Sequence, residues 1–231
     1  MGKSNRILAI KNISIETLGN FKPLFHNDGY VVDEVLAPEQ PIPANALDSD
    51  AIFILGGPMS ANDNHEYLIK EKQLIKQALD NEVLIVGICL GSQLIAETCG
   101  GRVYPGPKKE IGWGFVDLTK SGKKDLFKNI GNDGVDVFHW HGDTFDLPVQ
   151  AEVMARSDLY KQAFKYKTAY GMQFHLEVTE NMIFNWIKYY KKELILEKIS
   201  EDEILFDIKK RVLSLANLSK SVYQNFISVI R

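Results

Sequence analysis

Short apolar runs alternate with helical patterns through the first third of the chain. Runs of this kind are typical of strands buried in a parallel sheet. The predicted strands are residues 6–13, 30–35, 51–55 and 83–86. Helix-compatible segments run from about Glu16 to Asp28 and from Glu66 to Leu79. This alternation predicts an α/β fold with a doubly wound, mostly parallel central sheet flanked by helices, and a site at the carboxyl ends of the strands.

The middle of the chain changes character, because short strand candidates are separated there by turns rich in Gly and Asp. These candidates are residues 102–104, 114–118, 135–139, 153–157 and 169–174. They predict mixed or antiparallel strands on the far side of the sheet.

From Thr179 onward the pattern is helical. Two apolar stripes stand out, one including Ile183, Trp186 and Leu194, the other including Ile204, Val212 and Leu215. We expect residues 1–198 to form the α/β domain and residues 199–231 to form a C-terminal helical extension. The extension either packs on the domain or forms an interface with a second copy of the chain or another protein.

Composition narrows the class of protein. The 231 residues are 45% hydrophobic and 25% charged, which predicts a soluble globular chain with a substantial core. The net charge of -3 gives no electrostatic argument for nucleic acid or an anionic membrane as partner. No apolar run approaches the roughly 18 residues of a membrane-spanning helix. Two cysteines and an N-terminus without a signal-peptide pattern make a cytoplasmic location the expectation.

One segment carries a candidate nucleophile. The strand at 83–86 runs into Gly87-Ile88-Cys89-Leu90-Gly91, after which residues 94–96 continue in a helical pattern. A strand, a sharp turn and a helix with a reactive side chain at the apex form a nucleophile elbow, here with Cys in place of Ser. The glycines leave room at the turn, and the helix N-terminus favours the thiolate of Cys89. The alternative is a small buried hydrophobic residue at a strand end.

The segment from Gly87 to Gln93 resembles the nucleophile motif of the class I (triad) glutamine amidotransferases, and in particular of members similar to GMP synthetase. The resemblance covers roughly residues 6–190. It implies a Cys-His-Glu triad with Cys89 as the nucleophile and with no cofactor.

A second motif offers a base and a group to orient it. His175 and Glu177 lie two residues apart in an extended segment, so their side chains point the same way. A carboxylate bound to one imidazole nitrogen leaves the other free to take a thiol proton. Alone, the pair also fits a surface ion pair at a strand end. The order Cys89, His175, Glu177 matches the order in the family, which assigns His175 and Glu177 to the triad.

Backbone amides of Gly57 and Leu90 are the candidate oxyanion hole. Gly56-Gly57-Pro58 follows the third predicted strand. Glycine lets the backbone approach a substrate closely, and amides placed there would face a developing oxyanion. The same residues also suit a plain strand-ending turn. The segment resembles the Gly-Gly-Pro of the members similar to GMP synthetase.

The family resemblance assigns substrate binding to Gln93, Gly142 and Asp143. Gln93 lies one helical turn after Cys89, although it could also be a helix-surface amide. Gly142 and Asp143 belong to a segment similar to the loop whose backbone helps to hold the glutamine substrate. The spacing His139-X-His141 would suit zinc, but no third ligand stands near it in sequence, so no metal is expected.

The expected activity is hydrolysis of the glutamine side-chain amide through a γ-glutamyl thioester. The resemblance implies that the ammonia passes to a synthetase. Because the C-terminal residues are too few and lack a Gly-rich nucleotide loop, either this acceptor is a separate chain or there is no acceptor. An alternative keeps the triad and hydrolyses γ-glutamyl peptides or conjugates. A non-catalytic binding module is disfavoured, because every position of the triad is filled.

Overall fold

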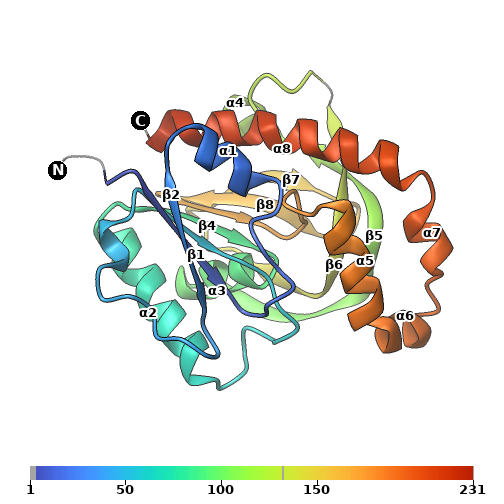
Figure 1. Cartoon of the computed structure of the whole chain (residues 1–231), viewed down its shortest axis with the longest axis horizontal. Helices are drawn as coiled ribbons and strands as arrows, with labels where there is room; N and C mark the ends of the chain where they lie inside the picture. Colours follow the sequence, from blue (N-terminus) through green and yellow to red (C-terminus); the bar gives the residue numbers. More distant parts are fainter. Residues whose placement is uncertain (1–3, 132, 231) are drawn as a thin grey trace.

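The computed structural model describes residues 4–131 and 133–230, whose strands form one sheet (Figure 1). The order of the nine strands in this part of the chain is β2-β1-β3-β4-β9-β8-β7-β5-β6. Their bounds are β1 Arg6–Lys11, β2 Val31–Leu36, β3 Ala51–Ile54, β4 Leu84–Ile88, β5 Arg102–Leu118, β6 Gly134–Asp146, β7 Glu152–Arg156, β8 Lys161–Tyr166 and β9 Ala169–Met172.

The sheet has a parallel half and an antiparallel half. Neighbouring strands from β2 to β9 run parallel, and those from β9 through β8, β7 and β5 to β6 run antiparallel. The predicted α/β sheet with flanking helices is therefore confirmed. The early, β-branched runs form its parallel part, where β1, β3 and β4 are buried on both faces while the edge strand β2 is partly exposed.

Helices cover both faces of the sheet (Figure 1). They are α1 Phe21–Asn27, α2 Glu66–Asp80, α3 Leu90–Thr98, α4 Lys120–Lys124, α5 Glu180–Tyr189, α6 Lys191–Glu197, α7 Glu201–Leu205 and α8 Ile208–Ile230, with a short 3₁₀ turn at Ala46–Asp48. Successive residues of a strand face opposite sides, so Ile7 and Phe53 share one core with α1, α5 and α8. Leu8 and Ile52 face the other core, with α2 and α3.

Three expectations about single elements are corrected. The helix expected from Glu16 begins only at Phe21, and the preceding residues form a loop. The two strand candidates at 102–104 and 114–118 are parts of one strand, β5, whose pairing with β6 shifts register between Pro105 and Glu110. The strand β8 was not expected, because its apolar centre is only Ala163 and Phe164 between polar residues.

The C-terminal helices pack on the sheet. Phe226 of α8 lies edge-on to Phe21, Phe53 and Tyr170, at ring-centroid distances of 6.5, 6.2 and 5.5 Å. Such aromatic contacts stabilise a shared core. The division of the chain at residue 198 stays a prediction. Within residues 4–131 and 133–230, no helix has both the length and the apolar character needed to span a bilayer.

Candidate active site

Cys89 lies at the sharp turn between β4 and α3. Its backbone angles, φ 50° and ψ -109°, fall outside the regions that L-residues usually adopt. A conformation of this kind costs about 1–3 kcal/mol and occurs mostly where function requires it. The turn is fixed by the Cys89 amide, which donates to Met172 O at 2.8 Å, and by Ser92 Oγ, which donates to Cys89 O at 2.7 Å.

The glycines around Cys89 are required by close packing. A Cβ atom on Gly87 would lie 2.4 Å from the carbonyl oxygen of Gly91. A Cβ atom on Gly91 would lie 2.0 Å from the carbonyl oxygen of Ile54 in β3. No side chain fits at either position, so helix α3 can approach the strand ends only with glycine there. The elbow expected from the sequence is present.

His175 and Glu177 follow β9 and form a buried pair. His175 Nδ1 lies 2.6 Å from Glu177 Oε1, and each side chain is 1% exposed. The His175 amide donates to Phe138 O at 2.8 Å, and its ring lies edge-on to Trp186, with the centroids 4.8 Å apart. With Nδ1 bound to Glu177, Nε2 is the nitrogen available to Cys89. Nε2 is buried and has no hydrogen-bond partner in the described part of the chain.

The loop before α1 holds the segment that carries this pair. The Asn20 amide donates to Glu177 O at 2.8 Å, and Asn20 Nδ2 donates to Leu176 O and Val178 O at 3.2 and 2.8 Å. Gly19, with φ +41°, permits this approach, since a Cβ atom there would lie 1.9 Å from Glu177 O. The helix begins at Phe21 because this loop is committed to residues 176–178.

Cys89 and His175 interact closely enough to shift each other's pKa. Burial raises the pKa of the Cys89 thiol, and its interaction with His175 offsets part of that rise. The helix N-terminus therefore does not dominate, contrary to the expectation from sequence. Burial lowers the pKa of His175, but Glu177 and Cys89 outweigh burial and place it well above its ordinary value. Each group is thus among the causes of the other's shift, and Cys89 Sγ donates its hydrogen bond to Trp140 O at 3.6 Å.

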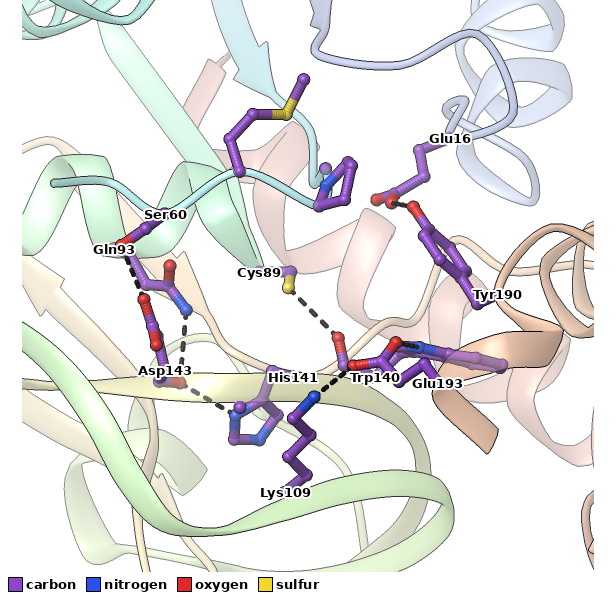
Figure 2. A pocket seen from close by; sticks show the side chains of 14 residues that line it. Glu16, Ser60, Cys89, Gln93, Lys109, Trp140, His141, Asp143, Tyr190 and Glu193 are labelled. Atoms are coloured by element: carbon purple, nitrogen blue, oxygen red, sulfur yellow. Dashed lines mark hydrogen bonds and ion pairs between the residues drawn. The ribbon is translucent and has the colours of Figure 1, made fainter. Parts of the chain in front are cut away.

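A cavity of about 260 Å³ opens beside Cys89 and is shown in Figure 2. Gly57 and Pro58 form part of its wall. A Cβ atom on Gly57 would lie 3.4 Å from Leu90 Cδ2, so the two predicted oxyanion-hole residues are neighbours. Gly57 belongs to the Gly-Gly-Pro loop, and Leu90 is the first residue of α3.

The three residues assigned to substrate binding also line this cavity. Gln93 Nε2 donates to Asp143 O at 3.3 Å and to Gln173 Oε1 at 3.2 Å. Asp143 Oδ2 accepts a hydrogen bond from Ser60 Oγ at 2.8 Å. Gly142 contributes backbone to the wall. The structure thus brings together all eight site residues predicted from the sequence.

His139 and His141 meet a third polar residue that sequence spacing did not reveal. Glu110 pairs with His141 across β5 and β6. It offers an oxygen that lies with the two ring nitrogens in a group within 4.8 Å, a set that could hold a cation. Glu110 Oε2 is 2.9 Å from His141 Nε2 and accepts from Gln162 Nε2 at 2.5 Å. Burial lowers the pKa of His139 to about 4, so that ring is neutral. His139 Nδ1 lies 3.6 Å from the same carboxylate oxygen and is buried without a hydrogen-bond partner among the described residues.

Known proteins share both the sequence pattern and the fold. The family model described as glutamine amidotransferase class-I matches residues 31–184. The chain belongs to the class I glutamine amidotransferase family. A glutamine amidotransferase-like protein of Salmonella typhimurium, YfeJ, is 34% identical over 82% of each chain.

Other members of the class I glutamine amidotransferase family are similar over different lengths. The crystal structure of a glutamine amidotransferase from Thermotoga maritima has a TM-score of 0.86 and 35% identity, and the match covers 95% of this chain and 96% of that one. A GMP synthase [glutamine-hydrolyzing] of Chromobacterium violaceum is 31% identical over 66% of this chain. The match spans only 30% of that synthase.

Among the cavity residues that the sequence analysis missed, Glu16 matters most for the chemistry. Glu16, from the loop after β1, lines the cavity and is 5% exposed. Tyr190 Oη donates to its Oε1 at 3.3 Å, while Oε2 is buried without a hydrogen-bond partner in the described residues. Burial raises the pKa of Glu16 to about 7, and the nearby Glu177 adds to the rise while His175 opposes it. The sequence around Glu16 fits a helix, and no local motif identifies it as a site residue.

Stability should depend on pH through Glu16. In the folded protein the Glu16 carboxyl keeps its proton up to about pH 7, whereas an ordinary carboxyl loses its proton near pH 4.5. The free energy of unfolding therefore falls as pH rises between these two values and does not change further above them. Relative to Glu16→Gln, the wild-type free energy of unfolding should drop by about 3 kcal/mol from pH 4.5 to 7.5. Urea denaturation of both proteins across this range measures the difference.

Glu39→Gln provides the control, because Glu39 is an exposed surface carboxyl. Its unfolding curves show the effect of the same exchange of Glu for Gln outside the cavity. A difference between wild type and Glu16→Gln that does not change with pH would show that folding leaves the pKa of Glu16 unshifted.

Proposed function

We propose that this chain hydrolyses the side-chain amide of glutamine through a γ-glutamyl thioester on Cys89. The main support is the meeting of Cys89, His175 and Glu177 in one buried site beside a cavity. Membership of the class I glutamine amidotransferase family supports the same reaction. A strained cysteine at the N-terminus of a helix, next to an imidazole oriented by a carboxylate, is an arrangement for nucleophilic attack on a carbonyl.

In the first half of the reaction, Cys89 Sγ attacks the γ-carbonyl carbon while its proton passes to His175 Nε2. Glu177 holds the imidazole and stabilises the imidazolium. The amides of Gly57 and Leu90 donate to the tetrahedral oxyanion, which stabilises charge present only near the transition state. The C–N bond then breaks as His175 returns the proton to nitrogen, and ammonia departs.

In the second half, water replaces ammonia. His175 takes a proton from the water as it attacks the thioester carbonyl, and the same amides hold the second oxyanion. The C–S bond breaks and the proton returns to Cys89 Sγ. The balance is glutamine and water to glutamate and ammonia. Gln93, Gly142 and Asp143 are proposed to hold the α-amino and α-carboxylate end of the substrate.

The ammonia is proposed to reach an acceptor enzyme on a separate chain. The relatives named as GMP synthase carry "glutamine-hydrolyzing" in their names, and this chain matches 30% of the length of one of them. This supports glutamine as the substrate and an acceptor carried elsewhere.

The test is to incubate the purified protein with glutamine and measure both products. Glutamate and ammonia should appear in equal amounts, and a glutamine-analogue diazo-ketone should stop both by alkylating Cys89. Hydrolysis of γ-glutamyl dipeptides that exceeds hydrolysis of glutamine would contradict the proposal and favour the peptidase alternative. A Cys89 that ignores the analogue would contradict both.

A further inference from the structure

Residues that line the cavity lie on two sides of Cys89, and we call these two sides the arms of the cavity (Figure 2). On one side lie Gln93, Asp143 and Ser60, joined by hydrogen bonds. On the other side lie Glu16 and Tyr190. If the first arm holds the glutamate end of the substrate, as proposed above, the second arm receives the group that leaves when the C–N bond breaks.

Glu16 presents an unused acceptor in this second arm. Its Oε2 lies next to the elbow, since a Cβ atom built on Gly56 would be 2.1 Å from Oε2 and 3.3 Å from Cys89 Cβ. The atom is buried and has no donor within the described part of the chain. Buried acceptors are rarely left unpaired in native proteins, so an acceptor at this place indicates a ligand donor. The nitrogen that departs from Cys89 carries such donors.

The second arm is also acidic. Glu193 of α6 lines it and lies near Trp140, whose Nε1 donates to Glu193 Oε2 at 2.9 Å. Lys109 is the cation in the cavity wall, and it is bound to Glu193 at 2.6 Å and to Glu197 at 3.3 Å. Its charge is therefore already matched by carboxylates. A leaving group that ends in a carboxylate would meet the unpaired Glu16 oxygen and the net negative cluster of Lys109 with two glutamates. It would meet no unpaired cation among the described residues that line the cavity.

We propose that Glu16 and Glu193 make the second arm a subsite for a neutral or cationic leaving amine, so that the enzyme takes glutamine and small γ-glutamyl amides and discriminates against γ-glutamyl peptides. This inference rests on the proposed function and decides between its two substrate classes. Glu16 Oε2 accepts a hydrogen bond from the departing nitrogen after His175 has given that nitrogen its proton. The cavity of about 260 Å³ suits a ligand the size of an amino acid, since pockets for drug-sized ligands begin near 300 Å³.

The test uses two substrates that differ only in charge, γ-glutamylglycinamide and γ-glutamylglycine. Wild-type kcat/KM should be about tenfold or more higher for the neutral amide at pH 8.5, where Glu16 is ionised. The preference should shrink at pH 6, where Glu16 is largely protonated. Cys89, His175, Glu177 and Tyr190 all face Glu16, but they act on both substrates alike, so their titration cancels in the ratio.

Glu16→Gln should lower the preference at pH 8.5 and remove its dependence on pH. The matched control is Glu71→Gln, since Glu71 of α2 is also a buried carboxyl with a raised pKa, about 8, but does not line the cavity. The Glu71→Gln protein should show the wild-type ratio of kcat/KM for the neutral amide to kcat/KM for the carboxylate. If Glu16→Gln does not fold, the pH dependence of the wild-type preference for the neutral amide still tests the inference.

The proposed subsite is overturned if kcat/KM is equal for the two substrates, or if Glu16→Gln leaves the preference unchanged. Either result leaves the proposal of glutamine hydrolysis intact. A protein that hydrolyses neither glutamine nor any γ-glutamyl compound overturns the proposed function as well, so the two failures are distinguishable.

Discussion

Replacing Cys89 with alanine should lower kcat/KM for glutamine by about 10⁴–10⁶-fold, the range found when a catalytic nucleophile is removed. Sγ is the atom that forms the thioester, and its position at the elbow is fixed by backbone contacts that alanine keeps. The variant should therefore fold and still bind glutamine. Glutamate release, followed by a coupled dehydrogenase assay, measures the loss.

Cys99→Ala is the matched control for this loss. Cys99 lies at the other end of α3, and burial raises the pKa of its thiol to about 12, so it is a poor nucleophile. Its variant should keep wild-type activity. Normal glutaminase activity in a purified Cys89→Ala protein would show that the site around Cys89 is not the active site.

Replacing Glu177 with glutamine should lower kcat by about 10³–10⁴-fold with little change in KM, the scale expected when a triad carboxylate becomes an amide. The amide NH₂ can donate to His175 Nδ1, which places the proton on Nε2 and turns an N–H toward Cys89. Loss of the carboxylate also removes a main cause of the raised pKa of His175. The acidic limb of the pH profile of kcat should move as a result.

Glu180→Gln serves as the comparison, because Glu180 lies three residues further on, in the first turn of α5, and outside the cavity wall. It should behave as the wild type. A Glu177→Gln protein with wild-type kcat would show that the carboxylate only supports the fold.

The parts of the site that could be predicted are those defined by local sequence. Gly87, Cys89 and Gly91 specify a strand, a turn and a helix within one short segment, and close packing explains why both glycines are needed. His175 and Glu177 share a direction because an extended backbone alternates its side chains. Both features can be predicted because they depend only on residues that are close together in the sequence.

Glu16 could not be predicted, because its position depends on contacts between distant segments. The sequence around it fits a helix, but Asn20 binds the backbone at residues 176–178 and Gly19 makes the approach possible, so the chain forms a loop there. The meeting of Glu110 with His141 has the same origin, since the pairing of β5 with β6 brings them together. Contacts of this range leave no periodic signal in sequence.

The most direct test of the central claim is to trap the covalent intermediate. The enzyme is mixed with glutamine, quenched in acid within its first turnovers, digested, and analysed by mass spectrometry. The account predicts a γ-glutamyl group on the peptide that contains Cys89, lost on mild base treatment as a thioester should be. Release of glutamate with no acyl group on Cys89 under any quench time, or with the group on Cys99, would contradict it.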